Sequence, residues 1–349
     1  MSEPARRARV LVLTTSYPAG PGDPSGHFVE AHARELARGG ADVLVLAPGP
    51  HAPAPGAPPV RSLPGRGAFG WPGVAERLRS EPWRAALLAP FALAAARAIR
   101  SAGPRDRLVA HWLLPSAWPL AFASEAPLEA WAHGADVRLL RSLPGPVRSR
   151  IVAAIADRCE RVVFVSAALR RLLGDALDPR TARSLERVSL VRPAPIHVPR
   201  RADLPPLRAS DRLGSDRPYA VWAGRLIASK RVDVAADVAA RAGLALVVIG
   251  RGPVPAPPGV LHLGQLPRDE TLAWIAGATA LLSTSRDEGA PTVVREARAL
   301  GVPVVAEPSG DLEAWARADP GIAIARGALA LGEALQAIAA RAGAPRVSD

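Results

Sequence analysis

Glu288 and Glu296 stand with seven residues between them around the start of a predicted helix. Pro291 and Gly301 indicate the two ends of that helix, because proline favours the first helical position and glycine the position just past the last. A helix N-terminus has free N–H groups and a partial positive charge, which suit a phosphate. A carboxylate at the same place would repel that phosphate unless it binds hydroxyl groups. The spacing therefore favours a ligand with both phosphate and sugar or ribose hydroxyls. The alternative is that Glu288 only favours the helix dipole and Glu296 is a surface residue.

Two cations earlier in the chain, Arg225 and Lys230, fall in one predicted loop between a strand over 219–223 and a helix over 232–241. Cations near a helix N-terminus are typical of a diphosphate site. Lys230 is the only lysine of a chain that otherwise uses arginine. Since lysine and arginine are not interchangeable at phosphate sites, its retention favours a phosphate contact, with drift as the alternative.

The elements that must position these residues alternate between strand and helix. An apolar run over 279–282, the helix after Pro291 and a second apolar run over 302–306 form a βαβ unit, so we expect a parallel sheet. Ligands of such sheets bind at the carboxyl ends of the strands, where Glu288 and Gly289 lie. Near the start of the chain, a strand over 8–14 and a helix over 28–38 repeat the pattern. The sequence predicts the α/β class.

The chain has 349 residues, enough for two domains with separate cores. Closely spaced prolines over 188–207 exclude a helix or an inner strand and indicate a boundary. We expect an N-terminal domain over 1–195, a linker over 196–215 and a C-terminal domain over 216–349. Residues 48–72, rich in proline and glycine, are expected to be irregular.

The net charge of +12 is uneven. Residues 1–200 contain 27 arginines against 16 acidic residues, which gives +11. Such a field steers an anionic partner, and an anionic lipid surface or a phosphorylated acceptor fits it. No nucleic-acid partner is expected, because no recognised motif accompanies the charge. A solvated arginine-rich face is the alternative.

The location expected is cytoplasmic, or peripheral to a membrane. The single cysteine, Cys159, excludes an internal disulfide and fits a reducing compartment. No signal peptide is recognised, and the apolar tract over 85–96 is shorter than the ~20 residues that cross a bilayer.

Two histidines follow predicted strands of the first half. His111 and Trp112 end the strand of LVAHWLLP, and His133 precedes Gly134 and Asp136. Neither H-E-x-x-H, nor paired cysteines, nor D-x-D occurs, so no metal and no cofactor are expected.

The segment SRDEGAPTVVREARALGVPVVA resembles the E-x7-E segment of the family-4 glycosyltransferases, the group 1 glycosyl transferases of GT-B fold, and PSGDLEAW resembles the Gly-rich turn that follows it. YAVWAGRLIASKRV is similar to the G-R-L…K-G loop of that family, with Arg231 in place of its glycine. The turn at His133 is similar to its HG-x-D turn. The resemblance implies a GT-B fold, with two Rossmann-like parallel-sheet domains facing a cleft.

The resemblance also implies roles for individual residues. Glu296 would hold the nucleotide ribose, Glu288 would lie near the transferred sugar, and Arg225 and Lys230 would stabilise the leaving diphosphate. The catalytic residues it implies are His133, Arg225, Lys230 and Glu288. The donor-binding residues it implies are Gly26, Gly224, Arg225, Lys230, Gly250, Leu266, Glu288, Gly289, Ala290, Thr292 and Glu296. The acceptor-side candidates are His111, Trp112 and Asp136.

The function implied is metal-independent transfer of a sugar from a nucleotide-sugar donor to an acceptor hydroxyl, with retention at the anomeric carbon. The acceptor is a sugar, a glycolipid or an anionic or lipid-linked glycan of the cell envelope or of a polysaccharide. Two alternatives stay open: a GT-B nucleotide-sugar epimerase, and a non-catalytic nucleotide-binding partner of another transferase. The turn at 195–197, Arg251 and the expected lack of a C-terminal crossing helix depart from the family and keep the second alternative open.

Overall fold

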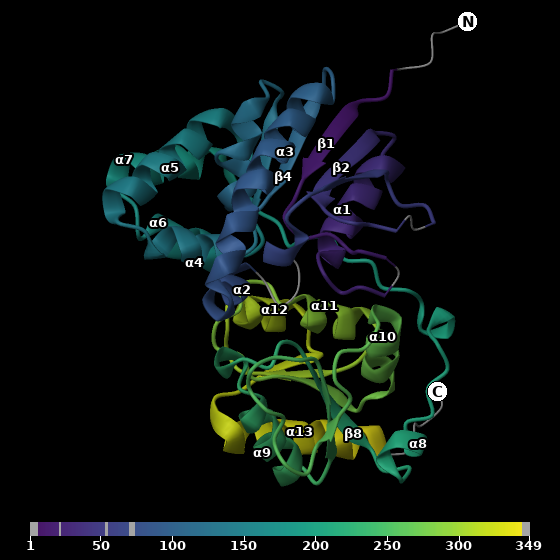
Figure 1. Cartoon of the computed structure of the whole chain (residues 1–349). Helices are drawn as coiled ribbons and strands as arrows, with labels where there is room; N and C mark the ends of the chain where they lie inside the picture. The colour runs from purple at the N-terminus through teal and green to yellow at the C-terminus, as the bar shows by residue number, and fades with distance from the viewer. Residues whose placement is uncertain (1–5, 21, 53–54, 70–73, 344–349) are drawn as a thin grey trace, which may run out of the picture. The chain divides into compact units, whose positions relative to one another are not determined.

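The computed structural model describes residues 6–20, 22–52, 55–69 and 74–343 (Figure 1). Contacts between Cα atoms divide the chain into two units, Met1–His197 and Val198–Asp349. Each unit has one sheet whose described strand pairs are all parallel, which confirms the α/β class and two Rossmann-like domains. In the described residues, no helix is both long and apolar enough to cross a bilayer.

The first unit contains a seven-stranded sheet in the order β3-β2-β1-β4-β5-β6-β7. Its strands are β1 (Arg9–Leu13), β2 (Asp42–Pro48), β3 (Val60–Leu63), β4 (Arg107–His111), β5 (Leu128–Ala132), β6 (Cys159–Phe164) and β7 (Ser189–Val191). Its α-helices are α1 (His27–Arg38), α2 (Val74–Ser80), α3 (Leu88–Ser101), α4 (Ala135–Ser142), α5 (Gly145–Arg158), α6 (Ala167–Gly174) and α7 (Pro179–Val188). The inner strands are almost entirely buried and read as continuous apolar runs, as strands covered on both faces do.

One expectation for this unit is wrong: residues 48–72 are not wholly irregular. Val60–Leu63 forms β3, which pairs in parallel with β2 through the register Val45↔Val60. This edge strand is mostly exposed and carries Arg61 and Ser62, so it lacks the apolar pattern of a buried strand. Its conformation depends on hydrogen bonding to β2, which no local pattern encodes.

The second unit contains a six-stranded sheet in the order β10-β9-β8-β11-β12-β13. Its strands are β8 (Tyr219–Ala223), β9 (Ala245–Ile249), β10 (Leu261–His262), β11 (Ala280–Ser283), β12 (Val304–Ala306) and β13 (Ile322–Ile324). Its α-helices are α8 (Ser210–Leu213), α9 (Val232–Arg241), α10 (Arg268–Gly277), α11 (Thr292–Ala299), α12 (Leu312–Ala318) and α13 (Gly327–Gly343). In Figure 1, α10, α11 and α12 cover one face of this sheet, while α9 and α13 cover the other.

The segment expected as a linker, residues 196–215, packs against the core of the second unit. The apolar side chains that make these contacts are Val198, Leu204, Leu207, Ala209 and Leu213. Burying such side chains contributes about 1.5–3 kcal/mol each when burial is complete. The segment is thus held along the second unit by its own hydrophobic contacts.

Candidate active site

The loop after β8 and the turn after β11 lie at the point where the strand order of the second sheet reverses. β8 and β11 are neighbours in the sheet although two strands separate them in the sequence. In open α/β sheets the crevice at the carboxyl ends of such strands is where ligands bind. Arg225 follows the end of β8 by two residues, and Glu288 follows the end of β11 by five. Topology thus brings together two groups that the sequence analysis found separately.

Lys230 and Glu288 form a direct ion pair at this point, although 58 residues separate them. Both side chains are largely buried, with 22% and 16% of their surface exposed. The hydroxyl of Thr284 donates to the carbonyls of Lys230 (3.0 Å) and Arg231 (2.8 Å). Because Thr284 is buried, these bonds fix the lysine loop against the end of β11.

The loop after β12 contacts the turn that carries Glu288. The backbone N–H of Glu288 donates to the Ser309 hydroxyl at 2.7 Å. Gly310 has a φ of 57°, and a Cβ there would overlap the carbonyl oxygens of Gly289 and Glu288. Only glycine allows this close approach, so the PSGD segment positions the glutamate turn.

Glu296 lies in the middle of α11 and is buried, with 5% of its surface exposed. Arg268, at the start of α10, donates to its Oε1 at 2.6 Å. Pro291 is the residue before the helix, which begins at Thr292, one position later than expected. Ala290 and Thr292 therefore flank the helix N-terminus, and Arg268 orients the Glu296 carboxylate through a charge-assisted hydrogen bond.

Arg231 occupies the position where the resemblance places a glycine. Its backbone conformation is one that glycine adopts more easily than other residues. Its φ is 51°, in the left-handed region. Its guanidinium donates to Glu307 Oε2 at 2.6 Å, and Arg286 contacts the same oxygen at 3.4 Å. Glu307 is buried, and its Oε1 has no hydrogen-bond partner among the residues that the structure describes.

Gly224, Gly250 and Leu266 surround the ends of β8, β9 and β10. Gly250 has a φ of 138°, and a Cβ there would overlap the carbonyl oxygen of Gly224, so the two turns touch. The N–H of Gly250 donates to the carbonyl of Gly264 at 2.7 Å. Leu266 is half-buried and packs against the hydrophobic core of the second unit. The contacts of these residues with a nucleotide remain a prediction.

In the first unit, three histidines form one hydrogen-bonded row. His32 Nδ1 lies 3.1 Å from His111 Nε2, and His111 Nδ1 lies 2.9 Å from His133 Nε2. His111 and His133 stack in near-parallel planes, and Phe28 and Trp112 pack against His133. His111 ends β4 and His133 follows β5, so both histidines expected from the sequence lie together at the carboxyl edge of the sheet.

All three histidines are neutral. Burial, and then the charges of Arg192 and Arg107, lower the pKa of His32 to about 3. Burial lowers the pKa of His133 to about 3 and holds that of His111 well below its usual range. A neutral imidazole has one donor nitrogen and one acceptor nitrogen. The row therefore forces the three rings into the same tautomer.

Asp136 holds the turn around His133. Its carboxylate accepts from the N–H groups of Leu113 (2.7 Å), His133 (3.1 Å) and Gly134 (2.9 Å). Burial raises the pKa of Asp136, and these backbone hydrogen bonds act in the opposite sense. Trp112 has a φ of 73°, an uncommon conformation for a residue other than glycine. The contact of Trp112 and Asp136 with an acceptor remains a prediction.

Gly26 lies at the N-cap of α1 with a φ of 64°. A Cβ there would overlap the Ser16 carbonyl, so glycine is required for the turn whatever it contacts. Its predicted contact with donor phosphates is untested by this geometry.

Sequence reasoning missed His32, Arg268 and Glu307. His32 left a signal, because it lies on the buried face of α1 among apolar residues and needs a partner there. Arg268 and Glu307 left none, since their partners lie 28 and 76 residues away.

Comparison with known proteins agrees with this geometry. Residues 217–341 match the family model described as Glycosyl transferases group 1. A curated relative, the putative teichuronic acid biosynthesis glycosyltransferase TuaC of Bacillus subtilis (strain 168), is 26% identical over 325 residues, which cover 85% of this chain and 80% of the relative.

Solved structures resemble the chain over nearly its full length. Sucrose-phosphate synthase from Thermosynechococcus elongatus superposes with a TM-score of 0.69 at 19% identity, over 96% of this chain and 90% of that one. HepE from Anabaena, in complex with UDP and glucose, gives 0.64 at 16% identity, over 95% and 89%. The chain is therefore a glycosyltransferase of GT-B fold, and its second unit matches the Glycosyl transferases group 1 family model over residues 217–341.

Proposed function

We propose that the protein transfers a sugar from a nucleotide-diphosphate sugar to an acceptor hydroxyl, with retention at the anomeric carbon and without a metal. The observation that carries the proposal is the Lys230–Glu288 pair at the strand-order reversal of the second sheet. A buried cation beside a carboxylate, at the approach to a helix N-terminus, suits a ligand with phosphate and hydroxyl groups on adjoining atoms.

Lys230 and Arg225 would meet the negative charge that grows on the leaving diphosphate. The first N–H groups of α11, from Thr292 onward, add a partial positive charge directed at the same oxygens. Preorganised charge of this kind contributes about 3–4 kcal/mol per well-placed group at a transition state. Glu288, which forms an ion pair with Lys230, would accept hydrogen bonds from hydroxyls of the transferred sugar.

Glu296 would bind the ribose of the nucleotide. Its carboxylate is buried and oriented by Arg268, so it can accept hydrogen bonds from two neighbouring hydroxyls without rearranging. His133, being neutral, would donate or accept one hydrogen bond with a sugar hydroxyl and add no charge.

HepE has been solved with UDP and with UDP-glucose, so a UDP-sugar is the first donor that we propose. The relative TuaC is named for teichuronic acid biosynthesis, which supports a carbohydrate acceptor from a cell-envelope polymer. We further propose that the excess arginine of the first unit brings the enzyme to an anionic or lipid-linked acceptor at a membrane surface.

Product analysis tests the proposal. The enzyme is incubated with UDP-glucose and candidate acceptors, and the anomeric proton of the product is followed by NMR. Retention predicts that the new linkage keeps the configuration of the donor. Glu296→Gln should lose donor binding and turnover, whereas Glu313→Gln, on an exposed side chain of the same unit, should keep both.

Three outcomes would contradict the proposal. An inverted product refutes retention, and a changed donor sugar without an acceptor indicates an epimerase. Nucleotide binding with no turnover on any donor and acceptor indicates a non-catalytic protein.

A further inference from the structure

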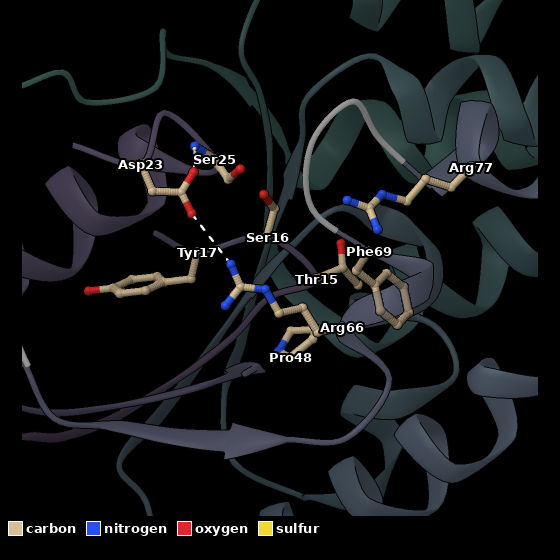
Figure 2. A pocket seen from close by; sticks show the side chains of 9 residues that line it. All are labelled: Thr15, Ser16, Tyr17, Asp23, Ser25, Pro48, Arg66, Phe69 and Arg77. Carbon is tan, nitrogen blue, oxygen red and sulfur yellow. Dashed lines mark hydrogen bonds and ion pairs between the residues drawn. The ribbon is translucent and has the colours of Figure 1, made fainter. Parts of the chain in front are cut away.

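A cavity of about 260 Å³ lies within the first unit, apart from the histidine row (Figure 2). It opens at the carboxyl ends of β1 and β2, and the polar residues that line it are Thr15, Ser16, Asp23, Ser25, Arg66 and Arg77. Ligand pockets usually measure roughly 300–1,000 Å³, so this cavity suits one monosaccharide-sized group and not an oligosaccharide.

Both arginines of the cavity are held by backbone carbonyls. Arg66 Nη1 donates to the Pro50 carbonyl at 2.6 Å, and Arg77 Nη1 donates to the Gly67 carbonyl at 2.9 Å. In Figure 2 the Arg66 guanidinium points toward Asp23, and the Thr15 and Ser16 side chains lie between it and the Arg77 guanidinium. These bonds orient both guanidinium groups within the cavity wall.

The carboxylate of the cavity, Asp23, is already engaged by the backbone. It accepts from the N–H groups of Ala19 (2.9 Å) and Ser25 (2.9 Å), and it forms an ion pair with Arg66 at 3.8 Å. The lining residues therefore carry two positive charges against one negative charge. That negative charge is directed mainly at the loop that it shapes.

The positive charges also act on one another. Burial, and then the charges of Arg84 and Arg66, lower the pKa of Arg77, while Glu81 raises it. An anion placed between the guanidinium groups would relieve this repulsion. It would also gain charge-assisted hydrogen bonds in the forked geometry that arginine offers to carboxylate and phosphate oxygens.

We propose that this cavity binds the carboxylate or phosphate group of an anionic acceptor sugar, through Arg66 and Arg77, with the hydroxyls of Thr15 and Ser16 as further hydrogen-bonding groups. The proposal rests on the proposed function, because it names the class of acceptor that this glycosyltransferase takes. The cavity belongs wholly to the first unit, so its binding can be measured separately from that of the nucleotide.

Binding titrations of the full-length protein test the assignment. Glucuronate, glucose 6-phosphate and unmodified glucose are compared by calorimetry at a fixed ionic strength. One of the two anionic sugars should bind about tenfold or more tightly than glucose, and the stronger of the two identifies the group as carboxylate or phosphate. Equal binding of glucose and both anions would overturn the proposal.

Charge-removing variants locate the site. Arg66→Gln and Arg77→Gln should each weaken the anionic sugar about tenfold or more, and Arg66→Lys, which keeps the charge without the fork, should lie between. Arg100→Gln removes the same charge from an exposed position on α3 and should change binding less than about twofold. A loss as large in Arg100→Gln as in Arg66→Gln would reduce the effect to general attraction and overturn the site.

A UDP titration of each variant distinguishes a failure of this inference from a failure of the proposed function. UDP binding that persists in Arg66→Gln and Arg77→Gln shows that these variants are folded. If anion binding is absent while UDP binding and transfer to a neutral acceptor persist, this inference fails alone. If no nucleotide binds to the unaltered protein, the proposed function fails, whatever the anion does.

Discussion

At the scale of residues, burial keeps three histidine side chains neutral at acidic pH values at which a histidine in water is protonated. His32, His111 and His133 are neutral because burial lowers the pKa of each. Their single row of hydrogen bonds then couples the tautomer of His133 to a ring on α1. A histidine so fixed presents one defined donor or acceptor to a ligand.

Stability should therefore fall as the pH falls from about 6.5 toward 3. The unfolded chain binds a proton at His32 near pH 6.5, whereas the folded chain does so only near 3, so acid favours unfolding. For His32 alone the loss at about pH 5 is roughly 2 kcal/mol. Asp136 acts in the opposite sense, because its raised pKa makes the folded state bind a proton more readily near its ordinary range.

Urea unfolding at neutral and acid pH measures this effect. His32→Gln should show a smaller difference between the two conditions, and His197→Gln, on an exposed side chain, should keep the difference of the unaltered protein. An equal acid loss in His32→Gln and the unaltered protein would refute neutral burial of His32.

The substitution Arg231→Gly has two opposing effects on the free energy of unfolding. Arg231→Gly relieves a left-handed conformation that costs roughly 1 kcal/mol. It also removes the closest partner of the buried Glu307, a loss of about 3–5 kcal/mol. The variant should therefore be less stable by about 2–4 kcal/mol in urea unfolding.

Adding Glu307→Gln to Arg231→Gly should restore part of that loss, because the uncompensated charge disappears. The control is Asp237→Asn, which breaks the exposed Arg241–Asp237 ion pair. It should lower the free energy of unfolding by less than about 1 kcal/mol. A more stable Arg231→Gly would show that backbone strain outweighs the pair.

At the scale of elements, the site depends on turns that glycine alone can make. Gly310→Ala should displace the turn of Glu288, because the new Cβ would overlap two carbonyl oxygens. We expect a loss of about 1–3 kcal/mol of stability, measured by denaturation, with reduced turnover. Gly301→Ala is the matched control: its φ is also positive, at 76°, but no atom lies within 4 Å of a Cβ. Equal loss of turnover in both variants would argue against a role for the Gly310 contact.

Sequence patterns predicted the elements wherever the chain is regular and buried. The strand over 219–223 and the helix over 232–241 have the bounds expected. β3 was missed because an exposed edge strand carries no apolar pattern.

The site was predictable only in part, for the same physical reason. Lys230 and Glu288 could be assigned to one site because each belongs to a local motif, and the structure brings them into contact. The Arg268–Glu296 pair and the histidine row join elements that only the fold brings together. Local sequence contains no record of such pairings.

At the scale of the whole molecule, the two units carry different charges and different candidate sites. The first 200 residues hold nearly all of the net positive charge. The cavity with Arg66 and Arg77 and the histidine row lie in the first unit, while the Lys230–Glu288 pair lies in the second. In our proposal, the cavity of the first unit binds the acceptor, and the Lys230–Glu288 pair of the second unit binds the donor.

Turnover should not depend on a divalent metal, because Arg225, Lys230 and the α11 N-terminus would carry the charge of the diphosphate. EDTA should leave the initial rate of transfer unchanged, and added magnesium should not raise it. A loss in EDTA that magnesium restores would contradict this prediction.

The dissociation constant of UDP for Lys230→Gln tests the central claim most directly, with Arg241→Gln, an exposed residue of the same unit, as the control. Losing a charge-assisted hydrogen bond to phosphate costs roughly 1.5–3 kcal/mol, so UDP should bind about ten- to a hundredfold more weakly to Lys230→Gln and unchanged to Arg241→Gln. Equal affinity for UDP in Lys230→Gln and the unaltered protein would contradict the account.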